Sequence, residues 1–361
     1  MKPTPREIVL EATDGRRRRA TLGGRAGPPG SQGSVWRVVE WPRLVVKLER
    51  RPDADRFPQK LEVMLRSRPE QLTARDGIIR VAWPLGRVRD ARGGRLLGYV
   101  QPALLQPGFA SLHHAFTGHG SLVPADATWR WYLELALDLA RTMSAIHRAG
   151  HVVADLSPEN LFATAGATVA FVDVDGWQIH DPRGGTPLPS PFSRDEYTPP
   201  EHLADPASRK ERRFSADRWA LSVLIAVILQ LGTHPFAGIP PGAEPPYDVR
   251  ANVEARRAVL LGTPLRPPPS APRAGLVLAG PLGLLLRRCL DEGYDDPEAR
   301  PRPEEWIDVL AEAQYEIRRC PTGPLHVHLP QAVRCPWCEL AARTGRDRFP
   351  LTRHSSGRHF P

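Results

Sequence analysis

Apolar residues recur every three or four positions between residues 129 and 148, and this period predicts an amphipathic helix that packs on a core. Gly150 follows as a natural C-cap. The same period predicts a helix over residues 57–67, and the nearly unbroken apolar run at residues 219–231 predicts a buried helix. Two further helices are predicted over residues 282–290 and 303–316.

Short apolar runs bounded by glycine and proline predict strands in the N-terminal third of the chain. From Leu22 onward the pattern is strand, glycine-rich turn, strand. Further strands are predicted over residues 44–48, 78–81 and 96–100. Residues 1–20 are charged, and we expect them to be flexible. Residues 237–273 are rich in proline and predict an irregular surface insertion.

Three polar side chains follow short strands in the middle of the chain. A β-rich run leads into Asp155, and Asn160 comes five positions later. A predicted hairpin with Gly166 at its turn then delivers Asp173 after the strand at residues 168–172. Phosphoryl transfer needs such a set, because one carboxylate accepts a hydroxyl proton while a carboxylate and an amide hold magnesium.

The predicted strand at residues 44–48 carries one lysine, Lys47, among apolar residues. An unpaired buried ammonium is costly, so Lys47 requires a partner. Glu49 is near in sequence but is a poor candidate for this partner, because it lies on the same strand as Lys47.

The glycine-rich stretch PPGSQGSV lies between the first two predicted strands and contains Gly30, Ser31, Gly33 and Val35. Glycines at such a turn let the backbone approach phosphate oxygens without a Cβ in the way. A glycine- and proline-rich hairpin loop without any ligand has the same composition. The stretch therefore supports a phosphate-binding turn only in combination with the residues that follow it.

These residues resemble the motifs of the protein kinase superfamily. Asp155 and Asn160 match the Asp and the Asn of the catalytic loop H-R-D-x-x-x-x-N. Asp173 matches the Asp of D-F-G, at about the family's separation from the loop. The match is imperfect. The residues that depart from the family pattern are Pro28, Val153, Ala154, Ser157, Val174 and Asp175. The D-x-D motif at residues 173–175 resembles that of a divergent bacterial kinase branch. Some members of that branch carry a C-terminal cysteine motif and belong to stress-response gene clusters.

The resemblance runs from about residue 22 to residue 318 and implies an α+β, bilobal protein kinase-like fold. Its parts would be a flexible N-terminus over residues 1–20, a small β-rich N-lobe over residues 21–101 and a larger helical C-lobe over residues 102–319. The resemblance also implies that Asp217 ties down the backbone of the catalytic loop. It further implies that Arg300 pairs with Glu201.

The resemblance assigns roles to the candidate site residues. Asp155 would orient and deprotonate the substrate hydroxyl, and Asn160 and Asp173 would hold Mg²⁺. Lys47 would bind the phosphates of ATP and pair with a Glu on the helix that follows, where Glu62 is the best-placed carboxylate of the predicted helix 57–67. The other residues implied to bind ATP are Gly30, Ser31, Gly33, Val35 and Gln101, the last at a hinge where kinases bind adenine through backbone groups.

A candidate metal site near the C-terminus consists of Cys320, His326, Cys335 and Cys338. Its C-x-x-C hook lets two thiolates bind one tetrahedral metal, and cysteine with histidine favours zinc. His328 is an alternative ligand, and reduced cysteines that cluster without a metal are an alternative interpretation. We expect a structural zinc within a zinc-binding motif at residues 320–340, followed by a basic flexible tail at residues 341–361. The isolated Cys289 is expected in the core.

The composition agrees with a folded protein, since 41% of the 361 residues are hydrophobic. The net charge of +9 predicts a solvated basic surface. Acidic protein partners or nucleic acid are the alternatives, and nucleic acid is not favoured because no basic stripe is interleaved with aromatic residues. There is no 18-residue apolar run and no apolar signal core at the N-terminus. We therefore expect a cytoplasmic protein without membrane contact.

The function predicted from the sequence is an ATP- and Mg²⁺-dependent Ser/Thr protein kinase with an unidentified protein substrate. The alternative is a pseudokinase that acts as a nucleotide-binding or scaffolding module. Pro28, Ser157 and Asp175 favour the alternative, because each removes a family feature near the phosphates. The candidate groups for the chemistry are nevertheless all present.

Overall fold

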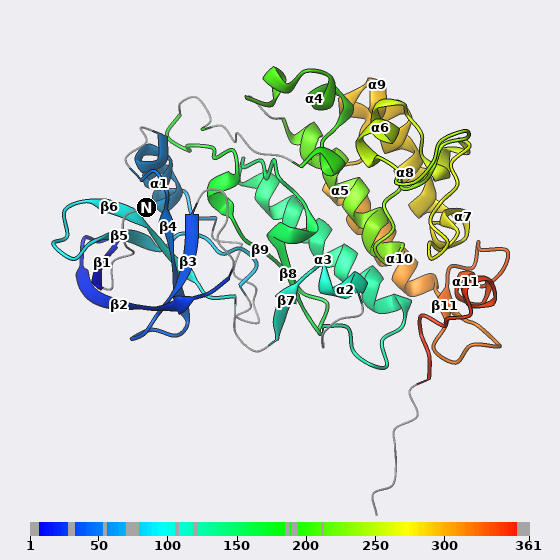
Figure 1. The fold of residues 1–361 in the computed structure, drawn as a ribbon, viewed down its shortest axis with the longest axis horizontal. Helices are drawn as coiled ribbons and strands as arrows, with labels where there is room; N and C mark the ends of the chain where they lie inside the picture. The colour runs from blue at the N-terminus through cyan, green and yellow to red at the C-terminus, as the bar shows by residue number, and fades with distance from the viewer. Residues whose placement is uncertain are drawn as a thin grey trace, which may run out of the picture.

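The computed structural model describes residues 7–27, 33–52, 56–69, 79–104, 108–117, 122–184, 188, 194–210 and 213–351. The N-terminal strands and α1 gather at one end of the molecule, and most of the other helices lie toward the other end (Figure 1). The C-terminal segment lies beside the helical end, away from the N-terminal strands.

Six antiparallel strands form a closed barrel in the order β1-β2-β3-β4-β6-β5. Their bounds are β1 Glu7–Ala12, β2 Arg17–Arg25, β3 Gly33–Val38, β4 Leu44–Glu49, β5 Gly86–Asp90 and β6 Leu96–Pro102. The barrel closes because β1 pairs with β2 on one side and with β5 on the other. Ile8, Val46 and Val88 point into a small apolar core of its own.

The prediction of a bilobal kinase-like fold was wrong, because the N-terminal strands close into this barrel. Residues 1–20 were expected to be flexible, but residues 7–12 form β1 and residues 17–20 begin β2. Ile8 and Leu10 alternate into the barrel core. On the other face of β1, buried Glu11 accepts hydrogen bonds from Arg17 and Arg89, so the nearby arginines stabilise the strand.

The strands around β5 also differ from the prediction. Residue 78 lies outside the described residues, and Val81 makes only an isolated bridge to Phe171. The strand that completes the barrel is β5, which the sequence analysis missed because two arginines and an aspartate interrupt its apolar positions. The prediction of a strand at residues 96–100 was confirmed by β6.

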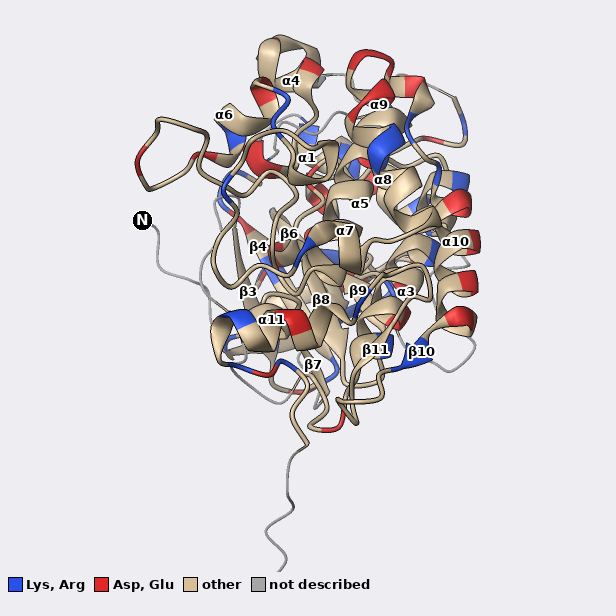
Figure 2. Cartoon of the chain, turned by 90° about the vertical axis from the view of Figure 1, so that its right-hand side faces the viewer, with Lys and Arg blue, Asp and Glu red and all other residues tan. Residues whose placement is uncertain are grey.

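The predicted long helices were confirmed. They are α1 Arg56–Arg66, α3 Trp129–Arg148, α5 Phe214–Leu229, α8 Pro281–Leu290 and α10 Pro303–Glu316. Helix α3 packs on both α5 and α10. Its first turn is capped by Thr128, whose side chain accepts a hydrogen bond from the backbone N–H of Arg130. Acidic residues follow one another along one side of α10 (Figure 2).

The remaining elements are short. Strands β7 Phe109–Ser111, β8 Leu161–Thr164 and β9 Val169–Phe171 form a second sheet, and β10 Arg318–Arg319 pairs with β11 Val327–His328. The short helices are α2 His114–Thr117, α4 Pro200–Ala204, α6 Val249–Glu254, α7 Ala274–Val277, α9 Glu292–Asp295 and α11 Pro336–Thr344. Residues 237–273 are mainly irregular, as predicted, and contain α6.

The C-terminal segment packs against the helices. The fully buried Trp337 lies 6.0 Å from Trp129 between ring centres, and Phe349 lies 4.9 Å from Trp337. Residues 341–351 were expected to be a flexible tail, and this was wrong, because α11 continues to residue 344 and the ring of Phe349 is buried. Residues 352–361 lie outside the described residues.

Among the described helices, none combines the length and the apolar composition needed to cross a membrane.

The barrel predicts a stability test at its first strand. Replacing fully buried Ile8 with Ala removes a core side chain and leaves a cavity, which should lower the free energy of unfolding by about 2–5 kcal/mol. Glu7→Ala, at an exposed position of the same strand, is the control and should change it by less than about 0.5 kcal/mol. Urea denaturation measures both. Equal stability of the two variants would show that β1 is not part of the folded barrel.

Candidate active site and metal centre

Lys47 lies on β4 with its side chain 6% exposed, facing away from the barrel core. Its ammonium pairs with Asp173 and lies 2.7 Å and 2.8 Å from the two carboxylate oxygens of Asp175. Both aspartates come from the segment that follows β9. The buried cation therefore joins the wall of the barrel to the end of the second sheet.

The predicted pair between Lys47 and Glu62 does not form, so this part of the prediction was wrong. Glu62 is half exposed and accepts a hydrogen bond of 2.6 Å from the guanidinium of Arg87. Positions 60 and 62 lie about 200° apart around a helix, so they cannot share a face. In α1 the buried face carries Lys60, whose ammonium donates a 2.6 Å hydrogen bond to the backbone oxygen of Asp175.

Three residues of this cluster were missed as partners by the sequence analysis: Lys60, Tyr99 and Asp175. The hydroxyl of Tyr99, fully buried on β6, donates a 2.7 Å hydrogen bond to Asp175. One signal was available, since Lys60 lies one turn before the apolar Met64 and therefore on the same side of the helix. Asp175 had been noticed only as a departure from the kinase pattern.

The two aspartates beside Lys47 differ in their electrostatics. Burial and the nearby Asp175 raise the pKa of Asp173, and the charge of Lys47 only partly offsets them. Burial also acts to raise the pKa of Asp175, but the charge and hydrogen bond of Lys47 outweigh it, and the pKa is lowered. Asp175 is thus held as an anion. A further cation beside Asp173 would be electrostatically favourable there.

Two more groups around this cluster have shifted pKa values. Burial lowers the pKa of Lys60 to about 8. Burial raises the pKa of Glu49 to about 8, with a smaller contribution from the charge of Asp175. Lys47 is different, because its two aspartates outweigh its burial and raise its pKa. Lys47 is therefore the cation that the cluster is built around.

The loop before β8 is fixed by one carboxylate from α5. Asp217 accepts hydrogen bonds from the backbone N–H groups of Val153 (2.7 Å) and Ala154 (2.9 Å), and it lies 3.0 Å from a ring nitrogen of His147. Ala154 itself has a left-handed backbone, with φ of 66°. The expectation that Asp217 ties down this loop was confirmed.

Asp155 and Asn160 lie together at the end of this loop. The amide nitrogen of Asn160 donates 2.9 Å hydrogen bonds to the backbone oxygen and to one carboxylate oxygen of Asp155. The other carboxylate oxygen of Asp155 is buried and has no hydrogen-bond partner among the described residues. The backbone N–H of Val172 donates a 3.0 Å hydrogen bond to the backbone oxygen of Asn160. Val172 directly precedes Asp173, so this bond brings the start of that segment close to Asn160.

The donor set at this place fits magnesium. Asp155 and Asp173 offer carboxylate oxygens, and Asn160 uses its amide nitrogen for Asp155, which leaves its carbonyl oxygen available. Mg²⁺ prefers oxygen ligands and is commonly held by one or two carboxylates together with water and phosphate. Asp173 is 38% exposed, so a ligand from solvent can reach it.

The structure gives less information about ATP binding at the other residues assigned to it. Gly30 and Ser31 lie outside the described residues. Gly33 has a structural reason, since a Cβ there would lie 2.3 Å from the backbone oxygen of Leu48 on the adjacent strand. Val35 lies opposite Lys47 in the pairing of β3 with β4.

The sequence analysis expected Gln101 at a hinge, but the residue belongs to a strand. It lies in β6, where it is paired with Val45 of β4. The strand continues to Pro102, and the backbone N–H of Ala103 still binds the oxygen of Arg43. The side-chain oxygen of Gln101 is buried and has no hydrogen-bond partner among the described residues.

The expected pair between Glu201 and Arg300 was confirmed. Two guanidinium nitrogens of Arg300 donate to the two carboxylate oxygens of Glu201 at 2.8 Å and 2.7 Å. Arg300 is fully buried and also donates to the backbone oxygens of Gly293 and Ser215. This fork joins α4 to the loop before α10 and is structural.

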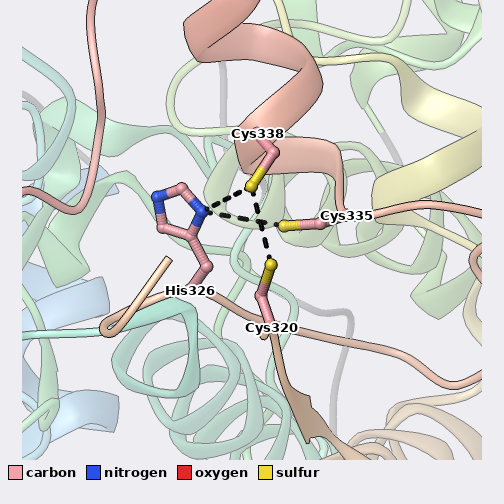
Figure 3. A group of neighbouring side chains, drawn as sticks. All are labelled: Cys320, His326, Cys335 and Cys338. Atoms are coloured by element: carbon pink, nitrogen blue, oxygen red, sulfur yellow. Dashed lines mark hydrogen bonds between the residues drawn. The ribbon is translucent and has the colours of Figure 1, made fainter. Parts of the chain in front are cut away.

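Figure 3 shows the four candidate metal ligands turned toward one another. Their ligand atoms, from Cys320, His326, Cys335 and Cys338, all lie within 4.8 Å of one another. The sulfur of Cys338 is 3.5 Å from that of Cys320 and 3.3 Å from Nδ1 of His326. Zinc–sulfur bonds of 2.3 Å in a tetrahedron put two sulfurs about 3.8 Å apart. The cluster fits a tetrahedral zinc ion.

His326 is the histidine that the structure brings to this cluster. Its Nδ1 faces the sulfurs, and its Nε2 lies 2.8 Å from the carboxylate of Asp347. A carboxylate on the second ring nitrogen is the usual way to orient a metal-binding histidine. His328 is directed elsewhere, with its Nδ1 bonded to the backbone oxygen of Leu329.

Comparisons with known proteins give two distant similarities. No family model matches the chain. The chain is 26% identical over 324 residues to a protein called protein kinase YegI from Escherichia coli O157:H7, a match that covers 88% of this chain and 48% of that protein. It is 24% identical over 326 residues to protein kinase YegI from Escherichia coli strain K12, with 89% and 48% covered. The chain thus spans about half the length of the curated relatives it matches.

The metal centre predicts a difference between the two histidines. His326→Ala removes a ligand and should reduce bound zinc from about one ion per chain to well below half, because three ligands hold the ion less tightly. His328→Ala is the matched control and should retain the zinc. Elemental analysis after gel filtration measures both. Zinc lost from His328→Ala and kept by His326→Ala would contradict the assignment.

Proposed function

We propose that the protein is an ATP- and Mg²⁺-dependent protein kinase that phosphorylates serine or threonine side chains. The observation that carries the proposal is the convergence of the catalytic loop with the Lys47 cluster. The buried unpartnered carboxylate oxygen of Asp155, the amide of Asn160 and the carboxylate of Asp173 lie at adjoining loop ends. The similarity to two proteins named protein kinase supports the same activity.

Each residue would have one task in this reaction. Asp155 would accept the proton of the substrate hydroxyl, and the hydrogen bond from Asn160 would hold its carboxylate in place. Asp173 and the carbonyl oxygen of Asn160 would hold Mg²⁺, and Lys47 would bind phosphate oxygens. Bound Mg²⁺ neutralises the charge that develops on the phosphates during transfer.

A second candidate function is a pseudokinase that binds nucleotide without transferring phosphate. Ser157 favours it, since the family's lysine is absent there and its side chain is fully buried with no hydrogen-bond partner among the described residues. Lys47 is also engaged by two carboxylates. We prefer the active enzyme, because Asp155, Asn160, Asp173 and Lys47 are all present.

Two isosteric variants test the assigned roles. Asp155→Asn removes the proton acceptor and should lower the rate of phosphoryl transfer at least about 100-fold, while nucleotide affinity stays within about threefold. Asp173→Asn should in addition weaken the Mg²⁺-dependent binding of nucleotide. Transfer of labelled phosphate to a generic acceptor measures the rate, and calorimetry measures the affinity.

The matched control is Asp308→Asn, at an exposed position of α10, which should leave both quantities unchanged. Equal phosphorylation by the wild type and both site variants would disprove the assignment. A wild-type protein that binds nucleotide tightly and transfers none would favour the pseudokinase.

A further inference from the structure

Asp175 has no part in the chemistry proposed above, yet it is the more deeply buried of the two carboxylates beside Lys47. Its side chain is 5% exposed, compared with 38% for Asp173. Both of its carboxylate oxygens lie within hydrogen-bond distance of the Lys47 ammonium. A charged carboxylate without a partner at this depth is strongly destabilising, so Lys47 and Asp175 depend on each other.

Three elements fix the position of Asp175. Tyr99, on the barrel strand β6, donates to its carboxylate at 2.7 Å, and Lys60, on α1, donates to its backbone oxygen at 2.6 Å. The residue itself lies in a tight turn, Val174–Gly176, closed by a 2.9 Å hydrogen bond from the N–H of Gly176 to the oxygen of Asp173. Asp175 is therefore a rigid acceptor, held independently of any ligand.

Asp173 is poorly suited to hold Lys47 during the reaction. It is the carboxylate proposed to bind Mg²⁺, and an oxygen that binds the metal no longer serves as a close partner of the ammonium. Lys47 has three N–H donors. If Asp173 turns to the metal, Asp175 still balances the charge of Lys47, and a donor becomes available for a phosphate oxygen.

We propose that Asp175 is the positioning residue for Lys47, in the role that the sequence had suggested for Glu62. It holds the ammonium toward the nucleotide phosphates, while Lys60 joins the turn of Asp175 to α1. This inference rests on the proposed nucleotide-binding function. It gives the two aspartates separate tasks, with Asp173 for the metal and Asp175 for the lysine.

A double-mutant cycle tests the inference. Lys47→Met and Asp175→Asn should each weaken the binding of a non-hydrolysable ATP analogue with Mg²⁺ by about tenfold or more. If Asp175 acts through Lys47, the double variant should be within about twofold of Lys47→Met alone. A merely structural role would instead multiply the two effects, to about 100-fold, and would overturn the inference.

Asp181→Asn is the matched control, because Asp181 also joins this segment to α1, through Arg66. Its analogue affinity should stay within about twofold of the wild type, and a loss equal to that of Asp175→Asn would overturn the inference. Glu62→Gln having the larger effect would overturn it as well. If Asp175→Asn does not fold, Tyr99→Phe takes its place in the cycle, with an expected loss of two- to fivefold that disappears in the Lys47→Met background.

The affinity cycle separates this inference from the kinase proposal. A wild-type protein that binds the analogue but transfers no phosphate would end the kinase proposal, and the cycle would still decide the role of Asp175. A folded wild-type protein that binds no nucleotide would overturn both.

Discussion

The buried ammonium of Lys47 is the constraint on which the arrangement of the site depends. Side chains alternate along β4, so that Val46 points into the barrel while Lys47 points out of it, toward α1 and the end of β9. A cation in that position is tolerable only beside fixed anions. The barrel and the loop after β9 are therefore joined by charge, across 126 and 128 residues of sequence.

The second fixed point is Asp217, which orders the loop of Asp155 from within the core. It is almost fully buried in the first turn of α5 and binds two successive backbone N–H groups. The loop that carries the candidate base Asp155 is thereby held in place by a helix. Lys47 belongs to the barrel and Asp217 to the helices.

The sequence predicted what depends on local periodicity and missed what depends on distant pairing. Helices α3 and α10 were predictable, because their apolar residues repeat strongly over several turns. The closure of the barrel was not, because it requires β1 to pair with β5, some 80 residues later, and nothing in either strand marks that partner.

The sequence analysis selected Glu62 instead of Lys60 on α1 for a similar reason. The rotation of α1 about its axis is set by what it packs on, including the hydrogen bond from Trp83 to the backbone of Met64. The spacing of the cysteines identified the metal cluster, but it did not distinguish His326 from His328, which the turn at Gly323 and the position of Asp347 decide.

The docking of Trp337 and Phe349 has a consequence for how the chain folds during synthesis. These rings complete the same apolar core that contains Trp129 and Tyr132, more than 200 residues earlier. As the ribosome extends the chain, that side of α3 stays uncovered until residue 349 has emerged. A chain interrupted before the cysteine cluster would leave Trp129 and Tyr132 without the rings that cover them, within reach of chaperones and proteases.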